Sequence, residues 1–292
     1  KTIYLIAFLL LFMIDKLLLI FNNYTRSLEL LYLINNLKPA VRLDANGIEL
    51  KKIKGFCNEN GLYLEVSDFK AIKLADEGKG SYSNIVKRVP TNHSSDGLYH
   101  IYISKDKNKA KFLKLLESRN DDKAVGQILG YPKCCIDFFI KNKEKQQKIQ
   151  NDYILPALNS SEGLEFPFYT NYAARYFDIT LLSHFPHSFN CKESVQIAKN
   201  NLECIKKYSN ELANKFEAML KSAVLYTENN GIFVLKDYKF GNNILKFNEI
   251  KSTINNELLN LLNKNKKIEI IDKNKIKING EVIGDIGIML FS

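Results

Sequence analysis

The sequence has few cysteines and lacks the short motifs that mark common enzyme classes. Five cysteines among 292 residues are too few and too unevenly spaced for a disulfide framework, and their number is odd. The chain also lacks the G-x-G-x-x-G, P-loop, G-x-S-x-G and H-E-x-x-H patterns, so the common nucleotide-binding and hydrolase functions lose most of their support. We therefore expect free thiols in a reducing compartment, with the protein in the cytoplasm.

Acidic residues are fewer than basic ones, and the difference gives a net charge of +10. A basic protein can bind a polyanion such as RNA, or an anionic membrane surface. The lysines are nevertheless scattered along the whole chain and do not form one stripe, a distribution that is typical of a solvated surface. RNA is therefore a partner that the charge allows but does not require.

The amino-terminal segment, residues 1–22, is apolar but interrupted. Residues 3–14 form an unbroken apolar run, and Asp15 and Lys16 separate it from a second run at 17–21. The first run is too short to span a bilayer, whereas the whole segment is long enough but carries the charged pair. Two interpretations stay open, a membrane-associated helix and a helix or extension that packs on the protein. Because every motif lies downstream, we expect the segment to be removable without loss of the fold.

The remaining sequence predicts an α+β protein with mixed small sheets. Residues 23–120 combine amphipathic helices with short strands and form an α/β region. Residues 121–223 are helical and carry the cysteine and histidine motifs. Residues 224–292 change to a strand-like period and predict a small β-rich unit.

Three local predictions follow from capping and turn chemistry. Ser104 is expected to cap the Lys-rich helix that follows it. Asn190, with Glu193 three residues later, is expected to open one long helix whose apolar stripe continues to Met219. The dipeptide Asn279-Gly280 predicts a tight hairpin, because both residues tolerate a positive φ.

Two short motifs concentrate the residues that can carry chemistry. The first is G-Y-P-K-C-C at residues 130–135, and the second is H-F-P-H-S-F-N-C at residues 184–191. In both, the spacing predicts that sulfur is delivered to the first turn of a helix, where unpaired N–H groups and the helix dipole favour a thiolate. We expect the two helix starts to share one site, formed by Cys134, Cys135, His184, His187 and Cys191.

The residues leave the occupant of this site open. Three thiolates and one imidazole make a normal tetrahedral zinc set. The spacing matches neither zinc ribbons nor ferredoxins, and adjacent cysteines are awkward joint ligands of one ion, which favours an iron–sulfur cluster or means that one cysteine is not a ligand. A metal-free thiol site and a set of buried structural cysteines are also compatible with the sequence. Burial in the core is expected for Cys57 and Cys204.

Asn171 and Arg175 are candidates for binding a small anionic ligand. They are four residues apart on a predicted helix that precedes the second motif, so one helix face would offer an amide and a guanidinium to a carboxylate or phosphate. A surface ion pair for Arg175 is the alternative interpretation.

The motifs resemble a known family. The resemblance rests on Ile103-Ser104-Lys105, on L-G-Y-P-K-C-C at 129–135 with Phe138-Phe139, and on L-S-H-F-P-H-S-F-N-C at 182–191. In this pattern the chain resembles domain of unknown function 483, a largely archaeal family, over most of its length beyond about residue 27. The resemblance implies that His187 occupies a cysteine position of the family pattern. It implies no established reaction.

Three functions remain in competition. The first is a metal- or cluster-dependent enzyme of redox or sulfur chemistry that acts on a small anionic molecule. The second is an RNA-associated protein in which the cysteine site holds a structural zinc ion and lysines contact phosphates. The third is an accessory protein attached to a membrane through residues 1–21.

Overall fold

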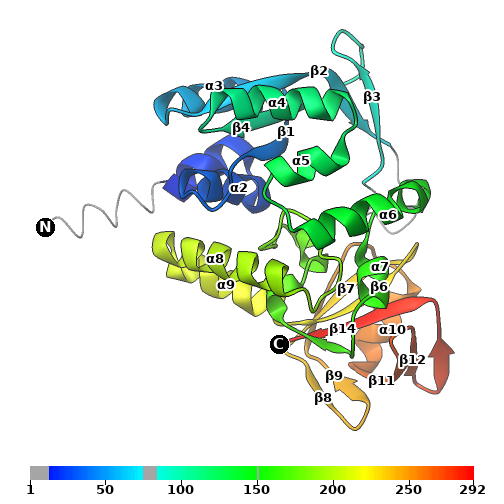
Figure 1. Ribbon diagram of the computed structural model, residues 1–292. Helices are drawn as coiled ribbons and strands as arrows, with labels where there is room; N and C mark the ends of the chain where they lie inside the picture. The colour runs from blue at the N-terminus through cyan, green and yellow to red at the C-terminus, as the bar shows by residue number, and fades with distance from the viewer. Residues whose placement is uncertain (1–12, 75–83, 150) are drawn as a thin grey trace, which may run out of the picture. The chain divides into compact units, whose positions relative to one another are not determined.

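A computed structural model describes residues 13–74, 84–149 and 151–292, and the chain forms two compact units (Figure 1). Both units combine helices with small sheets, and the carboxyl end is rich in strands, so the α+β prediction is confirmed. The division into four regions stays a prediction. The first unit consists of Lys1–Leu74, Ile85–Lys141 and Asn200–Ala213, and the second of Ala75–Asn84, Asn142–Lys199 and Asn214–Ser292.

The first unit contains a four-stranded antiparallel sheet in the order β1-β4-β2-β3. In β1, burial alternates strictly, with Val41, Leu43 and Ala45 facing the core, as the pleat of a half-buried strand requires. Val41 pairs with Ile103 of β4 and Leu43 with Ile101, and both partners are also buried. The strands are β1 (Val41–Ala45), β2 (Tyr63–Lys73), β3 (Val86–Pro90) and β4 (Leu98–Ser104).

The helices of this unit begin at short polar side chains. Asn46 and Glu49 form a complete capping box at the start of α3. The Lys-rich helix α4 begins later than predicted, because Asp106 and not Ser104 accepts its first N–H groups. The Ser104 hydroxyl instead donates to the Pro39 carbonyl at 2.9 Å. The helices are α2 (Tyr24–Ile34), α3 (Gly47–Glu59), α4 (Lys107–Ser118) and α5 (Asp122–Ile128).

The described part of the amino-terminal segment packs into the first unit. Residues 13–21 are helical, and Leu17 is fully buried while Phe21 is 2% exposed. Lys52 also donates to the Leu19 carbonyl at 2.9 Å. This burial argues against removing residues 13–21 without loss of stability, and residues 1–12 lie outside the described chain. None of the described helices is both long and apolar enough to cross a membrane.

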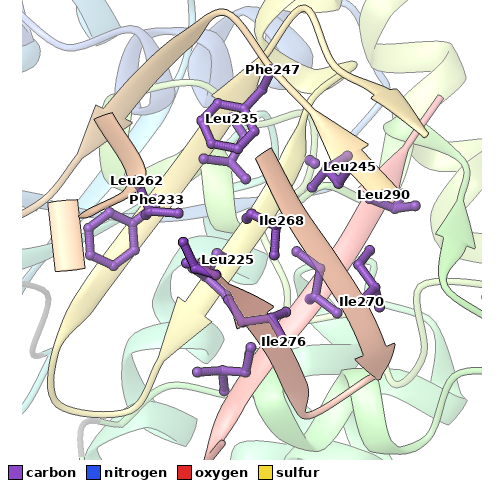
Figure 2. Close-up of a cluster of buried hydrophobic side chains, with 14 of the residues drawn as sticks. Leu225, Phe233, Leu235, Leu245, Phe247, Leu262, Ile268, Ile270, Ile276 and Leu290 are labelled. Carbon is purple, nitrogen blue, oxygen red and sulfur yellow. The ribbon is translucent and has the colours of Figure 1, made fainter. Parts of the chain in front are cut away.

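Two five-stranded sheets, in the orders β10-β7-β6-β14-β5 and β13-β12-β11-β9-β8, dominate the carboxyl end. Their apolar side chains, such as Leu225, Phe233 and Ile268, form the core drawn in Figure 2. The strands are β5 (Glu165–Phe166), β6 (Ala223–Thr227), β7 (Gly231–Lys236), β8 (Lys239–Gly241), β9 (Ile244–Lys246), β10 (Glu249–Ser252), β11 (Lys267–Asp272), β12 (Lys275–Ile278), β13 (Glu281–Ile283) and β14 (Ile286–Phe291), with α10 (Glu257–Asn265) before β11.

Local turn chemistry explains one confirmed prediction and one correction. Asn279 and Gly280 both have positive φ, of 52° and 89°, as the predicted hairpin between β12 and β13 requires. The prediction of a single long helix after Asn190 is wrong, because the segment divides into α8 (Lys192–Tyr208) and α9 (Asn210–Leu220). The hydroxyl of Ser209 accepts the Leu212 N–H at 3.1 Å and caps a new helix, although the apolar stripe continues across the break.

Candidate metal centre

The first motif places two cysteines at the start of a helix. Gly130 ends α5 with a φ of +79°, and a Cβ there would come within 2.9 Å of Pro39 Cδ. The Pro132 carbonyl then accepts the N–H groups of Cys135 and Ile136, both at 3.0 Å, and opens α6 (Lys133–Ile149). The prediction of a helix start at these cysteines is confirmed. The Sγ atoms of Cys134 and Cys135 lie 3.9 Å apart.

The loop of the second motif is held by buried hydroxyl groups. The N–H of Phe189 donates to Ser161 Oγ at 2.8 Å, beside the carboxyl end of α7 (Ile154–Asn159). The Phe189 carbonyl accepts the Thr170 hydroxyl, also at 2.8 Å, at the end of the 3-10 helix η1 (Phe168–Thr170). These two bonds hold both the N–H and the carbonyl of Phe189, two residues before Cys191.

Cys191 itself caps α8. Its Sγ accepts the backbone N–H of Ser194 at 3.5 Å, in the first turn of the helix. The predicted capping box of Asn190 is wrong, because the Asn190 side chain accepts the N–H of Glu162 at 3.0 Å. Sulfur therefore takes the capping role that local propensity assigns to an amide, and the same Sγ donates to a carboxylate oxygen of Glu193 at 3.5 Å.

The two motifs supply one group of potential metal ligands. Cys134, Cys135, His187 and Cys191 each offer one ligand atom, and these atoms all lie within 4.8 Å of one another. Cys135 and Cys191 are buried, whereas Cys134 and His187 are half-buried. This group could hold a metal ion, and the assignment of the individual site residues stays a prediction.

His184, which the sequence predicts as a fifth ligand, is not part of this group. The residue is 6% exposed, and its Nε2 lies 2.9 Å from the hydroxyl oxygen of the fully buried Ser194. His184 and His187 are three residues apart, and only the second of them reaches the cysteines as a ligand. The intervening Pro186 alone does not decide which histidine does so.

The structure places the two residues predicted to bind an anion in different local elements. They do not share an α-helix face, because Asn171 follows η1 and Arg175 lies in a second 3-10 helix, η2 (Ala173–Phe177). Asn171 is 1% exposed, and its amide donates to the Leu220 carbonyl at 2.8 Å. Their joint role in binding a ligand stays a prediction, and it no longer has the support of a shared helix face.

Arg175 lies among aromatic rings that border the second motif. Its guanidinium carbon is 4.8 Å from the ring centroid of Tyr172 and 5.4 Å from that of Phe185. The neighbouring Tyr176 hydroxyl donates to the carboxylate of the buried Asp152. Burial raises the pKa of Asp152, an effect that this hydrogen bond partly offsets. The cation–π contacts hold the side chains in a fixed arrangement beside the loop that carries His187.

The two remaining cysteines lie in the core. Cys57 is 1% exposed and Cys204 is 3% exposed, and both are free thiols. Burial raises the pKa of Cys57 to about 12 and that of Cys204 to about 11. A thiol in such an environment is inert at neutral pH, and the prediction that these cysteines are buried is confirmed.

Sequence reasoning missed a polar cluster in the first unit. His100 is 9% exposed, and its Nε2 lies 3.3 Å from a carboxylate oxygen of Asp44, its partner across the β1–β4 pair. Glu117 of α4 is bound by Arg42 at 3.0 Å and by Arg88 at 2.5 Å. Polar residues that alternate with apolar ones on β1 and β4 could have indicated such a cluster. The register that pairs Asp44 with His100 cannot be read from either strand by itself.

Comparison with known proteins identifies the region that carries both motifs. Residues 110–221 match the family described as "Protein of unknown function (DUF483)". This range is narrower than the resemblance predicted from the motifs, and the description assigns no activity. Neither a curated protein nor a solved structure matches the chain. All four potential ligands lie within this matched range, residues 110–221, which we call the DUF483 region.

Proposed function

We propose that the DUF483 region binds a single zinc ion through Cys134, Cys135, His187 and Cys191. The observation that carries this proposal is the compactness of the ligand group, whose atoms all lie within 4.8 Å of one another. In a tetrahedral site, Zn–S bonds of about 2.3 Å place two sulfur atoms about 3.8 Å apart. The distance of 3.9 Å between the Cys134 and Cys135 sulfurs fits that spacing.

The same compactness argues against an iron–sulfur cluster. Ligands that bind different irons are separated by the additional iron–iron spacing, so they lie farther apart than ligands of one ion. The adjacency of Cys134 and Cys135, which the spacing alone makes awkward for one ion, is accommodated because both sulfurs leave the first turn of α6 side by side. Thiolate and imidazole ligands also favour zinc over magnesium, calcium or manganese, which prefer oxygen.

A structural role fits this ligand set best. Four protein ligands fill a tetrahedral zinc ion and leave no open position for water or substrate, which is typical of structural sites. The ion would stabilise the DUF483 region through these four side chains. We further propose a reducing, cytoplasmic location, because thiolate ligands require reduced cysteines. An enzyme of redox or sulfur chemistry is the second candidate, and it requires iron or an open coordination position.

The test is metal analysis of the protein purified anaerobically, with a visible absorption spectrum. We expect about one zinc per chain and no colour. Cobalt substitution should give the visible bands of a tetrahedral, thiolate-bound ion. Cys191→Ser should lower the zinc content, whereas Cys204→Ser is the matched control, since it changes a buried cysteine outside the ligand group. Iron with labile sulfide, or the absence of any bound metal, would overturn the proposal.

A small anionic ligand beside the aromatic rings is a secondary proposal. It is supported by Arg175, whose guanidinium is held over Tyr172 and Phe185 near the second motif. Arg175→Lys keeps the charge but loses the planar donor fork, so it should weaken binding of a carboxylate or phosphate probe in calorimetry. Unchanged binding in that variant would exclude this role. RNA binding and attachment to a membrane stay predictions from composition.

A further inference from the structure

We infer that His184 is a positioning residue for the proposed zinc centre, and that it holds the loop of His187 against the helix start of Cys191 through Ser194. This inference rests on the proposed zinc function. It departs from the expectation that His184 is itself a ligand, because the compact ligand group contains His187 and not His184.

Ser194 connects the two sides of the loop through different groups. Its hydroxyl oxygen lies 2.9 Å from His184 Nε2, and its backbone N–H donates to Cys191 Sγ at 3.5 Å. Ser194 is fully buried and His184 is 6% exposed, so water does not compete for these bonds as it would at the surface. One residue of the first turn of α8 therefore contacts both the sulfur ligand and the loop histidine.

The position of His184 in the loop explains how it can act on the ligand His187. His187 follows it by three residues, and the intervening Phe185 packs against Tyr153 and Tyr172 with ring centroids 4.5 Å and 4.7 Å away. With Phe185 held by these rings and His184 held by Ser194, the backbone that carries His187 is anchored relative to α8. Partners outside the ligand shell commonly change metal affinity by about 10- to 100-fold when they are removed, because the ligands then lose their orientation.

The experiment measures zinc affinity by competition with a chromogenic chelator, in the full-length chain. His184→Ala should weaken zinc binding by about 10- to 100-fold. His184→Gln can still hydrogen-bond the Ser194 hydroxyl and should retain most of the affinity. Ser194→Ala keeps the backbone N–H to Cys191 but loses the hydroxyl, so it should weaken binding as His184→Ala does. His93→Ala, a change at an exposed histidine, is the control and should bind as the wild type does.

The double variant His184→Ala, Ser194→Ala separates positioning from general destabilisation. If the two residues act through one contact, the double variant should lose no more affinity than either single variant. Additive losses, or wild-type affinity in Ser194→Ala, would overturn the inference. If His184 were a ligand, His184→Gln would lose the ion and change the cobalt spectrum. A wild-type chain that binds no zinc would overturn the proposed function and this inference together, whereas a zinc-binding wild type with an unaffected His184→Ala would overturn the inference alone.

Discussion

Leu17 and Leu19 provide a matched test of how the amino-terminal segment contributes to the fold. Both lie in the helical residues 13–21, but Leu17 is 0% exposed and Leu19 is 75% exposed. Replacing either with alanine removes the same atoms and changes helix propensity by the same amount. A difference between the two variants therefore reports burial alone.

The expected difference is large because Leu17 is in the core. Leu→Ala changes at buried positions cost about 3 to 5 kcal/mol, as the transfer free energy is lost and a cavity is left. Changes at exposed positions cost less than about 0.5 kcal/mol. Since a typical free energy of unfolding is about 5 to 15 kcal/mol, Leu17→Ala removes a substantial fraction of the stability of the first unit. Leu19→Ala should be close to neutral.

Thermal and urea unfolding, followed by circular dichroism, measure the effect. A loss of about 1 kcal/mol lowers Tm by about 2 to 4 °C in a domain of this size, so Leu17→Ala should lower it by about 6 to 20 °C. Leu19→Ala should unfold with the wild-type midpoint. Equal midpoints for the two variants would show that residues 13–21 do not pack as described, and the segment would then be the removable element that the sequence suggests.

Three further predictions concern the ligands and the buried titratable groups. His187→Cys should keep zinc and His187→Ala should lose it, because a thiolate can replace an imidazole at zinc but a methyl group cannot. The measurement is metal content per folded monomer. Full zinc occupancy in the alanine variant would show that His187 is not a ligand. Burial raises the pKa of Cys204 to about 11, so this thiol should react with a chromogenic disulfide reagent at about pH 8 only after unfolding. Rapid reaction in a folded variant that keeps Cys204 as its single cysteine would contradict this burial. Burial lowers the pKa of His100, with the carboxylates of Asp44 and Glu117 opposing the shift, so below about pH 6.5 the unfolded chain binds a proton that the folded chain excludes. Stability should therefore fall as the pH drops from about 7 to about 5, and His100→Gln should fall less steeply over this range; parallel curves would refute the assignment.

The sequence by itself determined the features that depend on a few neighbouring residues. Gly130 ends a helix and the cysteines after Pro132 start another, because a left-handed stop and a proline act on the local backbone. Asn279 and Gly280 make the predicted turn for the same kind of reason. The core position of Cys204 followed from its place beside an apolar helical stripe.

Capping propensity and apolar periodicity gave wrong predictions at the starts of α8 and α9. Asn190 is the better helix cap by propensity, but its amide binds Glu162, and Cys191 caps α8 instead. The apolar stripe continues past Ser209, and periodicity alone could not reveal that its hydroxyl starts a new helix there. In both cases a hydrogen bond made in the folded chain decided between two locally acceptable structures.

Only the tertiary structure decided which of the candidate residues meet. Sequence spacing made His184 and His187 equal candidates, but the group of potential metal ligands contains His187, while His184 lies against Ser194. It also revealed the pairing of His100 with Asp44, which depends on the register of β1 and β4. The physical reason is that such contacts join residues far apart in the chain. Their distances depend on how whole elements pack, and the spacing of residues within one motif carries no information about that packing.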